Sequence, residues 1–464
     1  MKKILNILAK TINVLYKILP FFLGMNCYYP FFANQSPNPE TGLKIHVYPF
    51  LDAVYASLKL YAGCTESGIV INMELQIARF LALAATLSIL VYAFNKLTDL
   101  VNGVKLIGSG SVVVYGKSIY ADQMFESLDP RIRIRGDEKF VGHASKYLLM
   151  FSSDKENLQF YNRNYKLLKD KNVYIMLEST ARQNIENPLI TVFSISENSA
   201  RQYWKNYPVM KSEKIAIIGF DNVGKNILIY GLQMNLIDPE QHFEYHIFGD
   251  GSEFRIEHTE LDKMLPDEIV FHDDGIYKYS KSSKFDRIII CGGENDNIPL
   301  VSKLIMSAPR HPDIYVYAPN GDIITNLFGN ERVHCFGMAE ESASTDIIFN
   351  EKLMEDARRQ HEDYVNKYGG SPWEKLDSFK RYSNVSSSDY MYTIERLMEQ
   401  DIPFDTIAEL EHMRWCRYHY INNWKYGTER NDSERIHNSL VPFSELSDEE
   451  KQKDIDAVKS KLKK

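Results

Sequence analysis

An uninterrupted apolar run near the N-terminus constrains this chain more than any other feature. No charged residue, glycine or proline occurs between Phe80 and Phe94. With its flanks the run covers residues 77–97, and a helix needs roughly 20 apolar residues to cross a bilayer. Arg79 and Lys96 bracket it, and long basic side chains can extend to the membrane interfaces. A buried core helix is the alternative, but such helices are rarely apolar on every face. We therefore predict a membrane span.

A second apolar segment precedes this run. Residues 11–32 are rich in Leu, Ile, Phe and Tyr, and their aromatic residues would form an interfacial belt. The chain opens with Met-Lys-Lys, so a secretory signal peptide is the alternative. No small-residue cleavage motif follows at the right distance, and Lys17 interrupts the apolar region. The segment is therefore predicted to be a retained span.

The charges around the two segments predict an orientation. The loop between them is mainly acidic. Basic residues lie before or early in the first segment and at or after the end of the second; these are Lys2, Lys3, Lys10, Lys17, Lys96 and Lys105. Basic residues favour the cytoplasmic side of a membrane. Both termini are expected in the cytoplasm, with the protein in the inner membrane.

A short amphipathic stretch, residues 50–64, lies between the predicted spans. This arrangement resembles the two-transmembrane potassium-channel superfamily, which implies a pore-helix-like segment and pore residues Tyr61, Gly63 and Thr65. Two spans cannot enclose a pore alone, so the resemblance also implies a homo-oligomer, with a tetramer favoured. The chain lacks the Thr-Val-Gly-Tyr-Gly run of potassium filters. A plain hairpin anchor at residues 1–105 remains the alternative.

Strand-like and helix-like segments alternate through the next 260 residues. The expected strands are residues 111–115, 132–135, 147–150 and 173–176, followed by 214–218, 245–248, 287–290 and 314–317. Strands that alternate with helices predict parallel sheets covered by helices. We therefore expect two α/β domains of Rossmann type, at residues 106–205 and 206–370. The first has Gly116 as its single turn glycine and is expected to be degenerate.

The second series carries the better phosphate-binding turn. Gly219 and Gly224 follow a predicted strand and open a predicted helix, where backbone N–H groups would meet a pyrophosphate. Asp221 replaces the middle glycine of the usual motif, Asp250 would hold a ribose, and Gly292 ends a neighbouring strand. The ligand class this turn suits is NAD or another adenine nucleotide. A tight turn that binds nothing is the alternative.

The tandem arrangement after two spans resembles TrkA-N domains over residues 110–362. This resemblance implies that a bound nucleotide regulates the membrane part, and potassium transport is the activity that such domains control. Residues 219–226 also approach a P-loop, but Asn226 lacks the hydroxyl that would bind magnesium.

The C-terminal region carries the most specific motif. Glu411-His412-Met-Arg-Trp415 is followed by Asn423-Trp424-Lys-Tyr426-Gly427, and then by Arg430, Asp432, His437 and Leu440-Val-Pro-Phe443. This order resembles the ryanodine-receptor (RyR) repeat, with Asn438 where the repeat usually has proline. We place a linker helix and a small, mainly helical RyR domain at residues 371–464.

Aromatic and basic residues gather within this motif, and they could bind a planar, anionic ligand by stacking and charge. The candidate ligand-binding residues are His412, Trp415, Trp424, Tyr426, Arg430 and His437. The alternative is that the tryptophans form the core of a small helical domain, and this is favoured for Trp415.

Composition and spacing exclude several other classes. A net charge of -8 argues against a nucleic-acid partner. The five cysteines lack metal-binding spacing, and no catalytic set is recognisable, so we expect a protein that is not an enzyme. The leading hypothesis is a ligand-gated membrane effector or channel-like regulator that senses a small nucleotide-derived signal, in bacterial antiviral defence as the resemblances imply. A non-conducting membrane-anchored sensor and a nucleotide-dependent enzyme are the alternatives.

Overall fold

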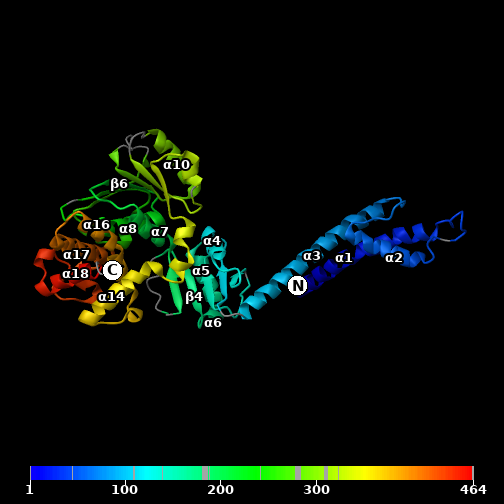
Figure 1. Cartoon of the computed structure of the whole chain (residues 1–464), viewed down its shortest axis with the longest axis horizontal. Coiled ribbons are helices and arrows are strands. Elements are labelled where there is room, and N and C mark those ends of the chain that lie inside the picture. Colours follow the sequence, from blue (N-terminus) through cyan, green and yellow to red (C-terminus); the bar gives the residue numbers. More distant parts are fainter. Residues whose placement is uncertain are drawn as a thin grey trace. The chain divides into compact units, whose positions relative to one another are not determined.

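The computed structural model describes residues 2–43, 45–107, 110–137, 139–179, 187, 189–240, 242–276, 284–307, 312–321 and 323–461. It divides into two compact units, Met1–Ile107 and Gly108–Lys464. Figure 1 shows the helices of the first unit and the sheets and helices of the second. The two units are described separately.

The first unit is built from helices alone. Helix α1 spans Lys2–Ala33 and α3 spans Met73–Ile107, and the short helix α2, Pro49–Lys59, continues into a 3-10 turn at Leu60–Ala62. Small residues line the contacts: Ala78, Ala82 and Ala85 of α3 are fully buried. Because small side chains let helix backbones approach closely, these alanines allow α3 to pack tightly on its neighbouring helices.

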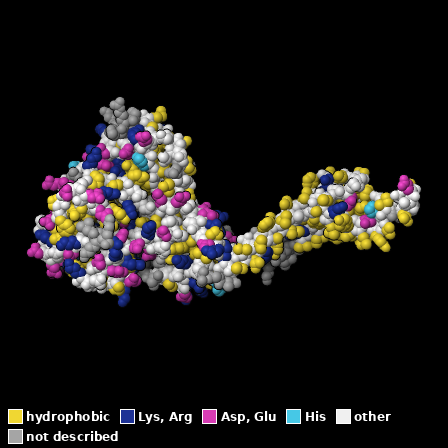
Figure 2. All heavy atoms as spheres, in the orientation of Figure 1, with side chains coloured by type: hydrophobic (Ala, Val, Ile, Leu, Met, Phe, Trp, Pro, Cys, Tyr) yellow, Lys and Arg dark blue, Asp and Glu magenta, His cyan; other side chains and the backbone are white. Residues whose placement is uncertain are grey.

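Most large apolar side chains of α3 are not covered by this packing. Phe80, Leu87 and Phe94 are each more than 60% exposed, and Figure 2 shows apolar side chains gathered along the helices of this unit. Among the described residues, one helix, Met73–Leu106, is long and apolar enough to cross a membrane, with a mean hydropathy of 2.0 in its best window. The helix is confirmed; the second span at residues 11–32, and membrane insertion itself, stay predictions.

The second unit begins with a five-stranded parallel sheet, ordered β2-β1-β3-β4-β5. Its strands are Val112–Tyr115 (β1), Arg133–Arg135 (β2), Lys146–Leu149 (β3), Asn172–Met176 (β4) and Ile190–Phe193 (β5). Helices α4 (Ile119–Ser127), α5 (Asp154–Arg163) and α6 (Tyr165–Leu168) connect them. Ser118 and Ser153 cap α4 and α5 by accepting backbone N–H groups. This strand order is the flavodoxin-like one rather than that of the Rossmann fold.

A six-stranded parallel sheet follows, ordered β11-β10-β9-β6-β7-β8. Its strands are Lys214–Ile218 (β6), Glu244–Phe248 (β7), Glu268–His272 (β8), Arg287–Ile290 (β9), Asp313–Tyr317 (β10) and Val333–Phe336 (β11). Helices α8 (Asn222–Met234), α9 (Ser252–Glu257), α10 (Glu294–Ser307) and α11 (Ile323–Phe328) connect them. The order reverses between β6 and β9, as in the Rossmann fold, so ligands are expected at the carboxyl ends of these two strands.

Three helices tie the two sheets together. Helix α7, Ile195–Asn206, follows β5 of the first sheet but packs on α8 of the second. Helices α12 (Ala339–Ser342) and α13 (Thr345–Ile348) follow the second sheet. Ala343, directly after α12, and Ile348 of α13 join the core of the first. The two parallel α/β sheets are confirmed, and each contributes a helix to the other.

Helices fill the C-terminal part: α14 (Glu355–Tyr368), α15 (Ser378–Asp389), α16 (Met391–Glu399), α17 (Phe404–Ile421) and α18 (Asp448–Lys461). Between α17 and α18 the two short strands Lys425–Tyr426 (β12) and Ile436–His437 (β13) pair. Helix α17 packs on α8 and α18, and its Ile407, Leu410 and Ile421 enter the core that contains α8. This packing places the C-terminal region against the second sheet.

Candidate functional site

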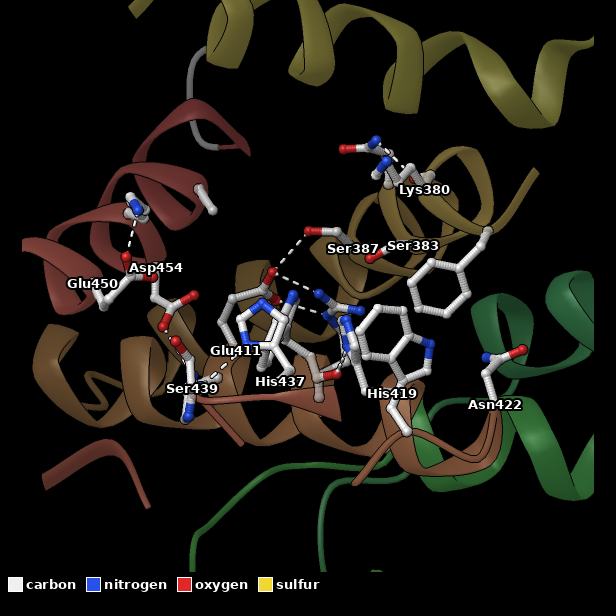
Figure 3. Close-up of a pocket in the computed structure, with 18 of the residues that line it drawn as sticks. Lys380, Ser383, Ser387, Glu411, His419, Asn422, His437, Ser439, Glu450 and Asp454 are labelled. Carbon is white, nitrogen blue, oxygen red and sulfur yellow. Dashed lines mark hydrogen bonds and ion pairs between the residues drawn. The ribbon is translucent and has the colours of Figure 1, made fainter. Parts of the chain in front are cut away.

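A cavity of about 650 Å³ lies within the C-terminal helical region. Residues of α14, α15, α17, α18 and the segment from Trp424 to Ser439 line it (Figure 3). Helix α17 supplies the floor, because Glu411, Trp415 and His419 follow one another at helical spacing and all line the cavity.

Aromatic rings surround one end of the cavity. Trp415 and His419 lie 4.0 Å apart between ring centroids, and His437 lies 4.9 Å from Trp415. Trp424 stacks on Phe379 at 5.1 Å and is 6% exposed, so its ring belongs to the core. Trp415 is only half-buried. In the structure Trp424 is therefore the tryptophan that packs in the core, and Trp415 is the more accessible one. The sequence had instead favoured Trp415 as the core residue.

Two buried histidines face this aromatic end. His419 and His437 are 5% and 8% exposed, and their ring centroids lie 5.8 Å apart. Burial lowers the pKa of His419 to about 3 and that of His437 to about 4. Nearby positive charge, including that of Arg430, lowers both further. Both rings are therefore neutral at physiological pH.

A third histidine has a structural task. Nδ1 of His412 lies 3.0 Å from an Asp454 carboxylate oxygen, and its Nε2 lies 2.8 Å from the Val441 carbonyl oxygen. Burial opposes charging of the ring, but hydrogen bonds to Asp454 and Cys416 outweigh it and raise the pKa of His412 to about 10. The charged imidazolium joins α17 to α18 across the cavity wall.

Carboxylates accompany four of the five lysines and arginines that line the cavity, and the fifth, Arg435, donates to the Asn422 carbonyl oxygen. Arg414 donates to both carboxylate oxygens of Glu411 at 3.0 Å, and the two side chains are almost fully buried. Arg430 pairs with Asp432 at 2.6 Å. Lys380 and Lys453 pair with Asp377 and Glu450. The cavity is therefore close to neutral and partly aromatic. Its side chains do not form the strongly cationic site that was expected for an anionic ligand.

Five of the six ligand-binding residues predicted here line this one cavity: His412, Trp415, Trp424, Arg430 and His437. The sixth, Tyr426, is 56% exposed and does not line it. Sequence reasoning missed Phe379, Glu411, Arg414 and His419 as cavity residues. The spacing of Trp415 and His419, one helical turn apart, was the available signal for His419.

The predicted nucleotide turn lies at the carboxyl edge of the second sheet. Gly219 has a φ of 83°, and a Cβ there would lie 2.8 Å from the backbone nitrogen of Gly292. A Cβ on Gly224 would lie 2.2 Å from the Gly219 carbonyl oxygen. Both glycines are therefore required for the packing of the turn itself, whether or not a ligand binds.

The two acidic residues of this edge are both exposed. Asp221 is the residue before α8, and partial desolvation by the surrounding protein raises its pKa even though the nearby N–H groups of Val223 and Gly224 act against this. Asp250 is exposed and accepts the Ser252 N–H at 2.9 Å. Asp250 lines a cavity of about 710 Å³ beside β7, β8 and α10. A ribose at the end of the second strand of a Rossmann sheet would enter this space.

The predicted pore residues lie at the end of α2 in the first unit. The Tyr61 carbonyl oxygen accepts the Thr86 hydroxyl at 2.7 Å, and the Tyr61 hydroxyl donates to the Lys17 carbonyl oxygen at 2.5 Å. Gly63 has a φ of 78° and ends the 3-10 turn, and Thr65 follows outside the helix. Within one chain, these bonds anchor the segment between α1 and α3.

Comparison with known proteins identifies the C-terminal region. Residues 392–464 match the family model of the RyR domain. No curated protein matches the chain. A crystal structure of one of the subunits of dipicolinate synthase from Bacillus halodurans matches with 11% identity and a TM-score of 0.23, over 53% of this chain and 97% of that one. A structural similarity this low carries no functional argument. The RyR-domain match contains Trp415, His419, Trp424 and His437, whereas Phe379 at the same end of the cavity precedes the matched residues.

Proposed function

We propose that this protein is a membrane-anchored sensor that binds a small nucleotide-derived ligand in the cavity of its RyR domain. The observation that carries the proposal is the aromatic end of that cavity, where Trp415, His419 and His437 meet. Ligand sites are typically concave, with aromatic walls and a few placed polar groups. A planar base suits these walls better than an extended polyanion does, because most of the lining cations already have carboxylate partners.

Direct bonds link the RyR domain to the second sheet and support a role in transmission. Arg417 of α17 donates to the carbonyl oxygens of Leu232 and Met264 and to the Asp267 carboxylate. Thr393 donates to the Met234 carbonyl oxygen. A ligand that shifts α17 would therefore act on α8 and the turn that follows it. An adenine nucleotide at the Asp250 edge, as TrkA-N resemblance suggests, would act on the same sheet.

The output of the sensor would be the helical unit of residues 1–107. Its exposed apolar surface supports insertion in a membrane, and the basic residues around the two predicted spans support an inner-membrane location with both termini in the cytoplasm. A channel of two-span subunits would require a homo-oligomer, with a tetramer favoured. A non-conducting anchor is the second candidate, and the Thr86–Tyr61 bond favours it, because that carbonyl oxygen already has a donor.

Calorimetric titration of the full chain in detergent tests the sensor, with NAD, ADP-ribose and cyclic di-AMP as probes. We expect at least one probe to bind the wild type and Trp415→Ala to weaken that binding at least tenfold. Tyr426→Ala is the matched aromatic control, and it should bind as the wild type does because Tyr426 does not line the cavity. Equal binding by Trp415→Ala would contradict the proposal.

The channel form of the proposal needs a separate measurement. Purified full chain in planar bilayers should pass current only when the bound probe is present. Binding without current would leave the anchored sensor and remove the channel.

A further inference from the structure

His419 and His437 of the RyR cavity each have one ring nitrogen, Nε2, without a partner among the described residues. The hydrogen-bond partner of the other ring nitrogen, Nδ1, determines which of the two nitrogens carries the hydrogen. Nδ1 of His419 lies 2.9 Å from the Trp415 carbonyl oxygen. A carbonyl oxygen only accepts, so this nitrogen must carry the hydrogen. Nε2 of the neutral ring then has a lone pair and acts as an acceptor.

His437 has the opposite arrangement. The backbone N–H of Ser439 donates to its Nδ1 at 3.0 Å. That nitrogen therefore carries no hydrogen, and in the neutral ring the hydrogen lies on Nε2, which acts as a donor. Neither Nε2 is among the described buried polar atoms that are both unpartnered and sealed from solvent. Both residues line the cavity, as Figure 3 shows. The aromatic end thus presents one acceptor and one donor.

We propose that His419 and His437 form a donor–acceptor pair that reads the edge of an adenine base. The assignment rests on the proposed function and specifies its ligand. Adenine has a donor, its amino group, beside an acceptor ring nitrogen, and it presents this pair on two edges. The amino group would donate to His419, and the ring nitrogen would accept from His437.

The surroundings favour a base over a phosphate at this position. Lowered pKa values keep both imidazoles neutral, so they offer hydrogen bonds without charge. Trp415 lies beside both rings, stacks on His412 and is half-buried, so part of its indole is accessible next to the two histidines. A bound ligand that lacks the matching donor or acceptor would leave Nε2 of His419 or His437 buried without a partner. This cost gives selectivity as well as affinity.

The test compares AMP with purine riboside 5′-monophosphate, which lacks only the amino group, by titration of the full chain in detergent. We expect the wild type to bind AMP at least about tenfold more tightly, the scale of one buried hydrogen bond left unmade. His419→Phe keeps a ring but removes the acceptor, and it should bind the two nucleotides equally. Thermal unfolding of each variant establishes that it is folded.

His361→Phe is the matched control. His361 is also buried and lines the same cavity, but both of its nitrogens have partners, in Ser371 and Asn384. This variant should keep the preference for AMP. Equal affinity of the wild type for both nucleotides, or binding of cyclic di-GMP but of no adenine ligand, would overturn the adenine assignment and leave the sensor standing. Binding of none of AMP, NAD, ADP-ribose, cyclic di-AMP or cyclic di-GMP would defeat both.

Discussion

Arg417 of the RyR domain and Asp267 at the edge of the second sheet form a buried ion pair, with Nη1 and Oδ2 2.5 Å apart. Their side chains are 3% and 1% exposed. Arg417 also donates to three backbone carbonyl oxygens, of Leu232, Met264 and Leu265. A buried arginine with this many acceptors fixes the position of α17 on the sheet.

Removing one partner of this pair should be strongly destabilising. Asp267→Ala leaves the Arg417 guanidinium buried without its carboxylate, which is expected to lower the free energy of unfolding by about 3–5 kcal/mol. Chemical denaturation of the full chain measures the effect. Asp262→Ala is the control, since Asp262 pairs with Lys263 at the surface and should change stability by less than about 0.5 kcal/mol. Equal effects of the two substitutions would contradict the assigned role.

The His412–Asp454 pair predicts a dependence of stability on alkaline pH. The folded-state pKa of His412, about 10, lies above its value in an unfolded chain, about 6.5. Its contribution is therefore complete below about pH 6.5 and is lost as the pH rises toward 10. Thermal unfolding should show a midpoint that falls between pH 7 and pH 10.

His412→Gln provides the comparison for this effect, because it removes the titrating ring from between Asp454 and the Val441 carbonyl. Its midpoint should fall less over the same pH range. A wild type and variant with the same pH dependence would show that other groups cause the decline.

Gly224 is predicted to contribute to the stability of the second sheet. Gly224→Ala places a Cβ 2.2 Å from the Gly219 carbonyl oxygen, so the backbone must shift, at a cost of about 1–3 kcal/mol. Gly275→Ala is the matched control, because a Cβ there meets nothing within 4 Å. The measurement is the midpoint of thermal unfolding without ligand. If Gly224→Ala unfolds as the wild type does, the turn is looser than the structure indicates.

The two cavity tryptophans should separate stability from binding. Trp424→Ala removes a ring that packs in the core with Cys416 and Leu440, and it should cost about 3–5 kcal/mol of stability. Trp415→Ala should lower stability less, because Trp415 is only half-buried. For a given loss of stability, it should weaken ligand binding more than Trp424→Ala does. Parallel denaturation and calorimetry test this. Equal losses of stability would contradict the assignment.

Helix α3 predicts that the full chain partitions with membranes and resists carbonate and high-salt extraction. Leu87→Arg places a charge at the centre of the apolar run and should reduce membrane insertion. Leu167→Arg is the control, at an exposed leucine of the second unit. Recovery of the intact wild type in the soluble fraction would rule out the membrane assignment.

Local patterns in the sequence were sufficient to predict most strands of the two sheets and the RyR region. Each of the eight predicted strands overlaps a strand of a parallel sheet, because short runs such as 112–115 and 215–218 are continuously apolar. The spaced motif from Glu411 to Phe443 was enough to identify the RyR region, since it combines many residue types in a fixed order. The strands at 190–193, 268–272 and 333–336 were missed. Each contains partly exposed or polar positions and lacks a continuous apolar run.

The arrangement of the candidate site was decided by tertiary structure alone. His419 and His437 are 18 positions apart, and only the packing of α17 against β13 brings their rings together. Their tautomers depend on the Trp415 carbonyl and the Ser439 N–H, which no motif specifies. The exchange of α7 and α13 between the sheets likewise depends on which buried faces fit. Periodicity and motifs report the contacts of a residue with its near neighbours in sequence, whereas strand order, burial and hydrogen-bond partners depend on contacts between distant segments, which exist only in the folded chain.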